Sequence, residues 1–286
     1  MTTQNPDFAV IGHPVAHSKS PLIHAAFARQ FGIVMDYGRI DAQPALFETE
    51  VETFFANGGR GLNVTVPFKE RAFALAREHL SARARQAGAV NTIWMHQSAI
   101  HGCNTDGVGL VRDLRRLSML EPGTRILLLG AGGAARGVIG PLLLEAGTRI
   151  LLANRTVSKA EALVTQWITE HPEHADRIAA SSLDSHAISQ TWDLIINATS
   201  SSLAGSTIEL PAGAIGSKTC IYDMMYGADP TLFLQAGQRA GALRTADGLG
   251  MLVCQASESF RIWHGVEPMV ERVIEEVRQQ LQASVR

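Results

Sequence analysis

A glycine-rich turn between an apolar strand and a helix is the strongest chemical signal in this sequence. The apolar run Arg125–Leu129 leads directly into Gly130-Ala-Gly132-Gly133-Ala-Ala135, which matches G-x-G-x-x-A, and a helical pattern follows. Glycines at this spacing permit a tight turn and let backbone N–H groups approach a pyrophosphate at a helix N-terminus. A lone glycine-rich turn is a weak signal, but its position between a strand and a helix favours dinucleotide binding over a purely structural turn.

The end of the next predicted strand indicates which dinucleotide is bound. Enzymes that use NAD usually place an acid there to hold the ribose 2′-hydroxyl. This sequence has Asn154-Arg155-Thr156, with Lys159 shortly after and no acid. Arg155 can form a forked contact with a 2′-phosphate, and a helix N-terminus favours anions. The alternative is that Arg155 and Lys159 are ordinary surface residues, but the missing acid favours NADP.

Polar residues also gather just past the apolar strands of the first hundred residues. They occur in His17-Ser-Lys-Ser-Pro21, in Asn63-Val-Thr-Val-Pro-Phe-Lys69, and around Asn91 and Asn104-Thr-Asp106. In open α/β sheets ligands bind at the carboxyl ends of strands, so a small polar ligand is expected. Taken singly, each segment has an ordinary explanation, because Lys69 on a helix face or Asn104-Thr-Asp-Gly in a turn is common.

Two series of alternating strands and helices must position these groups. Short apolar runs alternate with helical patterns over the first hundred residues, ending in an antiparallel pair at 89–95 and 99–103, and a second series begins after Pro122-Gly123. This alternation predicts an α/β fold with mainly parallel sheets. Residues after Leu249 have a helical pattern that breaks at His264-Gly265.

Composition excludes several classes of protein. Hydrophobic residues make up 46% of the 286 residues, which is enough for packed cores, and the net charge of −2 argues against a nucleic-acid footprint. Cys103, Cys220 and Cys254 are far apart, so we expect buried free thiols. His171-Pro-Glu-His174 has no third ligand nearby, so we expect no metal site. We expect no secretory leader, membrane span or membrane partner, and a cytoplasmic location.

Eight segments, in family order and spread over nearly the whole chain, resemble the shikimate dehydrogenase family. They are H-S-K-S-P at 17–21, N-V-T-V-P-F-K at 63–69, G-A-V-N-T at 88–92, N-T-D-G at 104–107, G-A-G-G-A-A-R-G at 130–137, N-R-T-x-x-K at 154–159, D-L-I-I-N-A-T-S at 193–200 and D-G-L-G-M-L-V-x-Q-A at 247–256. Together they are highly specific. The segment from Tyr226 to Thr231 departs from the commoner family spacing.

The resemblance implies a role for individual residues. Lys69 and Asp106 would form the catalytic pair. The residues implied to bind substrate are Ser18 and Ser20 at its carboxylate, Thr65, Asn91 and Gln255 at its ring, and Tyr226. Those implied to bind the cofactor are Gly130, Ala131, Gly132, Gly133, Ala134, Asn154, Arg155, Thr156, Lys159, Met224 and Gly248. A substrate domain of residues 1–106 and 242–286 and a Rossmann-type NADP domain of 107–241 would form two lobes, because the helical tail returns to the first lobe.

The implied activity is the reversible reduction of 3-dehydroshikimate to shikimate with NADP(H) and no metal, in chorismate and aromatic amino acid biosynthesis. Reduction of a ketone builds negative charge on oxygen, and Lys69 would donate the neutralising proton. One alternative is a quinate/shikimate dehydrogenase of broader specificity, and another is a catalytically silent NADP-binding regulator. We expect small-molecule partners only, in a monomer or homodimer.

Overall fold

The chain forms two compact units in the computed structural model, which describes residues 6–199 and 208–284. Unit 1 contains Met1–Gly109 and Leu252–Gln280, and unit 2 contains Leu110–Met251 and Leu281–Arg286. The chain passes from unit 1 to unit 2 within helix α5 (Asp106–Arg116) and returns within helix α9 (Leu249–His264). Gly265 ends α9 in the left-handed region with φ of 72°, as the predicted break requires.

Unit 1 is built on a five-stranded sheet with the order β2-β1-β3-β4-β5. β1 pairs in parallel with β2 and β3, whereas β4 runs antiparallel to both β3 and β5. The strands are β1 (Phe8–Gly12), β2 (Tyr37–Asp41), β3 (Gly61–Val64), β4 (Thr92–His96) and β5 (Ala99–Cys103). The helices are α1 (Ser20–Phe31), α2 (Phe47–Ala56), α3 (Lys69–Leu75), α4 (Ala82–Ala87), α9 and α10 (Glu271–Ala283), with 3-10 turns η1 (Pro44–Leu46) and η2 (Arg77–His79).

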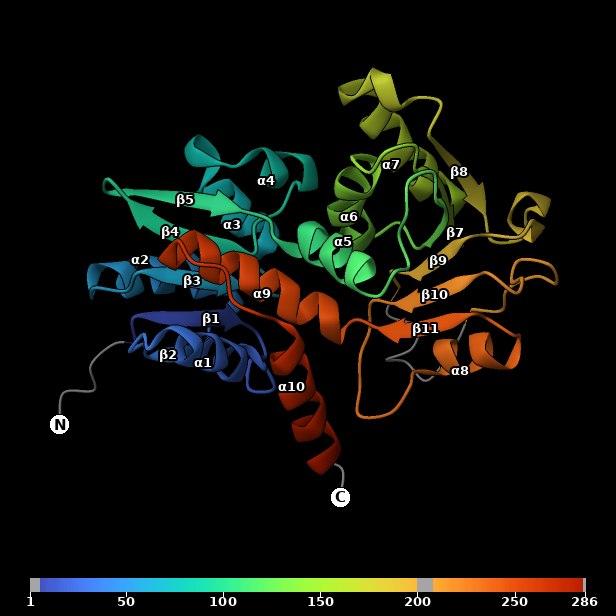
Figure 1. Ribbon diagram of the computed structural model, residues 1–286. Helices are drawn as coiled ribbons and strands as arrows, with labels where there is room; N and C mark the ends of the chain where they lie inside the picture. The colour runs from blue at the N-terminus through green and yellow to red at the C-terminus, as the bar shows by residue number, and fades with distance from the viewer. Residues whose placement is uncertain (1–5, 200–207, 285–286) are drawn as a thin grey trace. The chain divides into compact units, whose positions relative to one another are not determined.

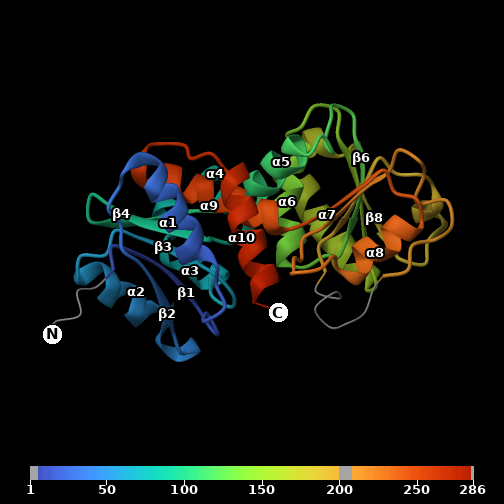
Figure 2. The ribbon, with the colours of Figure 1, turned by 60° about the horizontal axis from the view of Figure 1, so that its bottom comes forward.

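Strand β3 shows how the two faces of this sheet differ. Successive side chains of a strand point to opposite faces. Leu62 and Val64 belong to a core cluster with aromatic residues of α2, while Asn63 between them contacts Ser259 of α9 on the other face. α1 and α2 lie on different sides of the strands in Figure 2. The sheet therefore has one wholly apolar face and one that carries polar residues under α9.

Unit 2 is built on a six-stranded, wholly parallel sheet with the order β11-β10-β9-β6-β7-β8. Its strands are β6 (Arg125–Leu129), β7 (Arg149–Asn154), β8 (Ile178–Ser182), β9 (Leu194–Asn197), β10 (Cys220–Asp223) and β11 (Arg244–Asp247). Its helices are α5, α6 (Gly133–Leu143), α7 (Val157–Glu170) and α8 (Leu232–Arg239), with 3-10 turns η3 (Pro172–His174) and η4 (His186–Ser189). The predicted α/β class with mainly parallel sheets is confirmed.

Alternation along β6 divides the core of unit 2 into two layers. Ile126 and Leu128 pack with apolar residues of α5, α6 and α7, whereas Leu127 and Leu129 pack with Phe233 of α8. Figure 1 shows these helices around the sheet. Both faces are covered, which is why the strand reads as a continuous apolar run rather than an alternating one.

The expected return of the chain at residue 242 is wrong by about ten residues. β11 pairs in parallel with β10, so residues 244–247 form the edge of the unit 2 sheet. The sequence Arg-Thr-Ala-Asp has no apolar run because an edge strand needs little burial.

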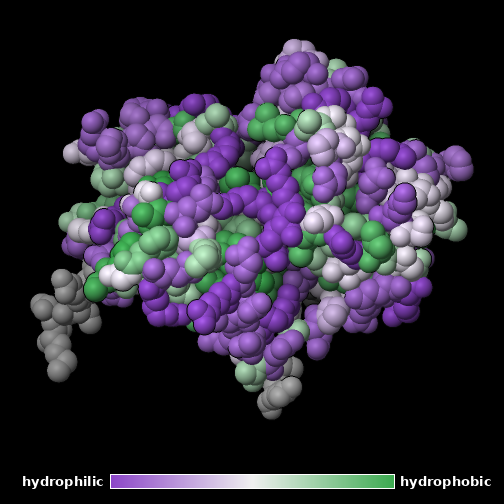
Figure 3. Space-filling view, in the orientation of Figure 1, coloured by the Kyte–Doolittle hydropathy of each residue, from purple (hydrophilic) through white to green (hydrophobic). Residues whose placement is uncertain are grey.

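The surface is mainly polar on the face drawn in Figure 3, with apolar residues in scattered patches. The exposed large apolar side chains include Val34 at 98% and Met269 at 71%. Within residues 6–199 and 208–284, no helix has both the length and the apolar character to cross a membrane. All three cysteines are free and buried.

Candidate active site

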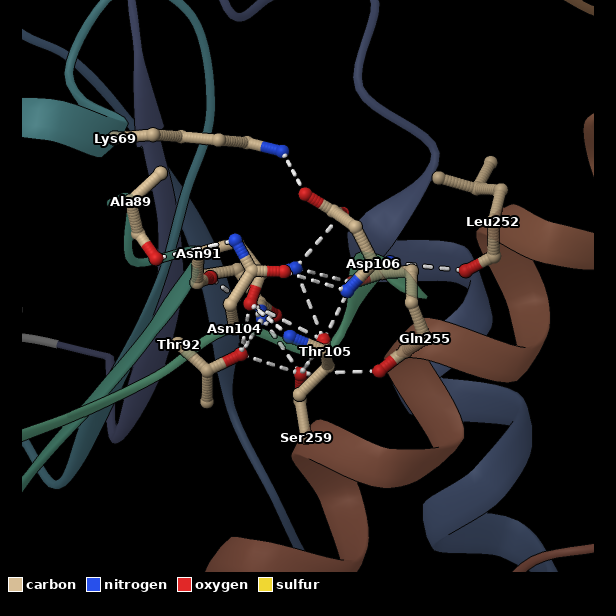
Figure 4. A network of polar contacts seen from close by, with 11 residues as sticks. Lys69, Ala89, Asn91, Thr92, Asn104, Thr105, Asp106, Leu252, Gln255 and Ser259 are labelled. Atoms are coloured by element: carbon tan, nitrogen blue, oxygen red, sulfur yellow. Dashed lines mark hydrogen bonds and ion pairs between the residues drawn. The ribbon is translucent and has the colours of Figure 1, made fainter. Parts of the chain in front are cut away.

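Lys69 and Asp106 form an ion pair in unit 1. Each is the first residue of its helix, Lys69 of α3 and Asp106 of α5. The Lys69 Nζ atom lies 2.6 Å from Asp106 Oδ2, and the two side chains are 31% and 22% exposed. Figure 4 shows them pointing toward each other. The structure thus brings together two groups that are far apart in sequence and leaves both open to a ligand.

Asn91 holds the other oxygen of this carboxylate. Its Nδ2 atom donates to Asp106 Oδ1 at 2.9 Å, while its Oδ1 atom accepts from the Thr105 backbone N–H at 2.9 Å. The backbone donor identifies the amide oxygen, so the Asn91 amide nitrogen must face Asp106. Gln255 of α9 approaches the same cluster, with its Oε1 atom 3.3 Å from Asn91 Nδ2 and 3.2 Å from Thr105 Oγ1. Asn91 is 3% exposed, so it holds the Asp106 carboxylate from the buried side of the site.

Ser18, Ser20 and Thr65 lie at the carboxyl ends of the neighbouring parallel strands β1 and β3. The Ser18 and Ser20 hydroxyls are 3.1 Å apart, and Ser18 Oγ also accepts from the Ser20 backbone N–H at 3.3 Å. Thr65 packs on Gly12, where an added Cβ would lie 2.4 Å from its Cγ2 atom. Because β1 and β3 are parallel, these groups and Lys69 share one edge of the sheet.

The structure also shows contacts of five buried polar residues to which our sequence analysis gave no individual role, although four of them lie in the segments quoted there. Asn63, Thr92, Asn104, Thr105 and Ser259 are all at most 6% exposed, and each is hydrogen-bonded to a neighbour of Asn91 or to Asn91 itself. For Asn63 and Thr92 in strands and Ser259 in a helix, a polar type among apolar neighbours is the signal that could have found them, because buried polar groups need partners.

The glycine loop of unit 2 is an open turn at a helix N-terminus. Gly130 follows β6 with φ of 102°, and a Cβ there would lie 2.7 Å from Thr199 Cγ2, so only glycine fits. Gly132 caps the N-terminus of α6, and Gly132, Gly133 and Ala134 are exposed. A Cβ at Gly132 or Gly133 would meet nothing within 4 Å. The open turn and the helix N-terminus fit a bound phosphate.

The predicted adenosine-end residues follow β7 at the same edge of the unit 2 sheet. Asn154 is the last residue of β7, and its Nδ2 atom donates to the Thr156 carbonyl at 2.8 Å. Thr156 precedes α7 as its N-cap residue, and Arg155, Thr156 and Lys159 are all exposed. Two exposed cations at a helix N-terminus can accept an anionic group, as a 2′-phosphate requires.

Met224 and Gly248 are in direct contact beyond the ends of β10 and β11. A Cβ on Gly248 would lie 2.1 Å from the Met224 carbonyl oxygen. Asp223 fixes this segment, since its Oδ1 atom accepts from Asn197 Nδ2 at 3.1 Å and from the Met225 N–H at 3.1 Å. Tyr226 lies in unit 2, where burial and the charge of Asp247 raise its pKa. Its expected place beside the substrate stays a prediction.

Metal ligands do not gather in the part of the chain that the structure describes. Residues 6–199 and 208–284 contain no group of three or more histidine, cysteine, aspartate or glutamate side chains that could hold an ion. His171 and His174 instead stack on Trp167, with the His171 ring centroid 3.9 Å from the indole.

A glycine loop at the carboxyl edge of one parallel sheet and a lysine–carboxylate pair in a second α/β unit are typical of dinucleotide-dependent oxidoreductases that act on alcohols. Three family models match the chain: shikimate dehydrogenase substrate binding domain over residues 10–93, shikimate/quinate 5-dehydrogenase over 116–209, and shikimate 5'-dehydrogenase C-terminal domain over 248–278. The chain belongs to the shikimate dehydrogenase family.

Individual relatives agree over nearly the whole length. The chain is 51% identical to a shikimate dehydrogenase (NADP(+)) of Bordetella petrii over 278 residues, covering 97% of each chain. Among solved structures, an Ael1 enzyme from Pseudomonas putida matches with a TM-score of 0.87 at 40% identity, covering 94% of this chain and 97% of that one. Shikimate 5-dehydrogenase from Thermus thermophilus, in complex with NADP(H) and shikimate, matches with a TM-score of 0.80 at 31% identity over 96% and 98%. The resemblance read from the sequence motifs is thereby confirmed.

Proposed function

We propose that this protein catalyses the reversible, NADP(H)-dependent interconversion of 3-dehydroshikimate and shikimate, a step of chorismate and aromatic amino acid biosynthesis. The observation that carries this proposal is the Lys69–Asp106 pair, 2.6 Å apart, partly exposed and held by Asn91. A protein that only bound the cofactor would have no use for this arrangement. The name of the Bordetella petrii relative supports the same activity.

NADP(H) is the proposed cofactor because the end of β7 offers Arg155 and Lys159 and no acid at the position where an NAD enzyme has one. The exposed glycines at the start of α6 would hold the pyrophosphate, with Ala131 and Ala134 beside them. Met224 and Gly248 would lie near the nicotinamide. When bound, NADPH supplies the hydride.

The residues of unit 1 would bind the substrate and move its proton. Ser18 and Ser20 offer two hydroxyls, 3.1 Å apart, to the substrate carboxylate. Thr65, Asn91 and Gln255 offer hydrogen bonds to ring hydroxyls, and Tyr226 is proposed as a further contact. Lys69 donates a proton from Nζ to the oxygen that gains negative charge on reduction, and accepts it back on oxidation. Asp106 holds the ammonium in place through Oδ2.

The deciding experiment is an absorbance assay for NADPH formation from shikimate and NADP. General acid–base catalysis contributes roughly 10²–10⁴-fold, so Lys69→Met should lower kcat at least about 100-fold while NADP binding persists. Lys218→Met, at an exposed loop position of unit 2, is the matched control and should retain wild-type kcat. A near-normal kcat for Lys69→Met would remove this residue from the mechanism.

The same assay separates the alternatives. Comparable turnover of quinate, or of either substrate with NAD, would indicate a quinate/shikimate dehydrogenase of broader specificity. NADPH binding without turnover of any of these substrates would indicate a regulator. We propose small molecules as the partners of this chain and a cytoplasmic location, in a monomer or homodimer.

A further inference from the structure

Asn63 is a polar residue buried in the middle of β3, and a contact on each side orients its amide. The Tyr37 hydroxyl of β2 donates to Asn63 Oδ1 at 2.7 Å. The Nδ2 atom lies 3.4 Å from the Asn91 carbonyl, which can only accept, and it donates to Ser259 Oγ of α9 at 3.0 Å. Asn63 is 6% exposed and Ser259 is fully buried, so solvent does not compete for these bonds.

The next contacts run from Ser259 to Asp106. Thr92 Oγ1 donates to Asn91 Oδ1 at 3.0 Å. The Ser259 and Thr92 hydroxyls are 2.7 Å apart, and either of them can be the donor in that contact. Asn91 Nδ2 then donates to Asp106 Oδ1 at 2.9 Å. Ser259 also lies 3.2 Å from the Gln255 carbonyl, a longer contact than the one to Thr92.

Five hydrogen bonds join these residues and end on the carboxylate of the candidate catalytic pair. Their order is Tyr37, Asn63, Ser259, Thr92, Asn91 and Asp106. Hydrogen bonds in such a chain polarise one another, and an N–H donor favours the ionised form of a carboxylate. We call these six residues the inner hydrogen-bond chain.

We propose that Tyr37, Asn63 and Ser259 are positioning residues, which through the inner hydrogen-bond chain keep Asn91 donating to Asp106 and leave Asp106 Oδ2 to Lys69. This inference rests on the proposed function, because it assigns the chain a purpose in the proton transfer of Lys69. Figure 4 shows Ser259 and Thr92 beneath the pair, on the side away from Lys69. These residues act from behind the pocket, through Asn91.

The start of the chain is anchored by aromatic packing. The Tyr37 ring stacks on the His24 ring with centroids 4.5 Å apart and lies 6.4 Å from the Trp263 ring. Tyr37→Phe therefore keeps the packing and removes the hydroxyl, so its bond to Asn63 is lost together with its interaction with Ser20. Ser259→Ala interrupts the chain at its middle.

Ser257→Ala is a matched control on the same helix. Ser257 is also fully buried, and its Oγ atom has no hydrogen-bond partner within the described part of the chain. Loss of that hydroxyl removes a buried oxygen from α9 without touching the inner hydrogen-bond chain, so activity should stay at the wild-type level.

The test is the pH profile of kcat for the three variants. We expect Tyr37→Phe and Ser259→Ala to lower kcat roughly 3- to 10-fold and to move the acid limb of the profile up by about half to one pH unit, because the carboxylate loses hydrogen-bond support. KM for NADP should stay unchanged. Profiles of both variants that coincide with those of Ser257→Ala would overturn the proposal, as would a loss of kcat without any shift of the acid limb.

A readout without turnover separates this inference from the proposed function. The Asn91 side-chain amide signal, assigned by its loss in Asn91→Asp, can be followed by ¹⁵N NMR against pH. In Tyr37→Phe its midpoint should move up by about half to one unit, while Ser257→Ala leaves it in place. An inactive wild type would refute the proposed function alone, whereas an unmoved amide midpoint in Tyr37→Phe would refute the inner hydrogen-bond chain. Tyr37→Phe suffices if Ser259→Ala fails to fold.

Discussion

His24 should make the stability of unit 1 fall in mild acid. This residue lies on α1, is fully buried, and its ring stacks on Tyr37. Burial lowers the pKa of His24 to about 3, opposed by the nearby Asn63 side chain and helped by the nearby His264. The ring is therefore neutral in the folded protein across the physiological range.

The size of the effect follows from the two pKa values. Above pH 6.5 His24 is neutral in both the folded and the unfolded chain, so it adds no pH dependence. Below pH 6.5 the unfolded chain binds a proton that the folded chain excludes, so the free energy of unfolding falls by about 1.36 kcal/mol per pH unit. The loss is about 2 kcal/mol at pH 5 and approaches about 5 kcal/mol near pH 3.

His24→Phe is the perturbation that isolates this contribution. Phenylalanine keeps an aromatic ring against Tyr37 and cannot bind a proton. We would measure urea unfolding of the wild type and the variant at pH 7.5, 6 and 5. The wild type should lose about 2 kcal/mol more than the variant between pH 7.5 and 5, with carboxylate titrations common to both cancelling in the difference.

Pulsed hydrogen exchange read by mass spectrometry should report each unit separately, because a chain of two units need not unfold in one step. Peptides from α1 would report unit 1, and peptides from α7 would report unit 2 as an internal control. The reasoning is refuted if wild type and His24→Phe lose stability in parallel between pH 7.5 and 5, since His24 would then be protonated in the folded state.

Two further predictions concern unit 2. Gly250→Ala should lower the free energy of unfolding of unit 2 by about 2–3 kcal/mol in urea, because the new Cβ would lie 2.1 Å from the buried Asp113 carboxylate. Gly137→Ala in α6 is the control and should not destabilise the unit, because its Cβ would meet nothing within 4 Å. Equal stability of the two variants would contradict this prediction. Replacing Arg155 and Lys159 together by alanine should weaken NADP binding about 10- to 100-fold by calorimetry, in line with the loss of one or two charge-assisted hydrogen bonds, and change NAD binding much less. Equal losses of affinity for NADP and NAD would contradict the proposal that Arg155 and Lys159 bind a 2′-phosphate.

The sequence alone determined the features that depend on local spacing. The strand, glycine turn and helix around Gly130 are contiguous, so the turn could be identified from residue order and from the need for a φ that only glycine adopts readily. The alternation of apolar runs and helical patterns likewise predicted α/β units, because periodicity and turn residues are properties of short segments. The missing acid after β7 was also visible locally.

Only the tertiary structure decided which distant residues meet. The parallel pairing of β1 and β3 and the antiparallel turn to β4 bring Lys69, Asn91 and Asp106 within hydrogen-bond distance. The family motifs named these residues, but nothing in the local pattern shows their contact. The edge strand β11 escaped prediction because it has little apolar surface to bury, and the place where the chain returns to unit 1 was therefore misjudged.

The buried side of the site shows the same division. Asn63 and Ser259 are 196 residues apart in sequence and share a hydrogen bond. From the sequence alone, a polar residue inside an apolar strand indicates only that it needs a hydrogen-bond partner, because a buried amide without a partner would cost free energy. The identity of that partner, and the path of hydrogen bonds from Tyr37 to Asp106, depend on sheet order and on the packing of α9, which no local pattern encodes.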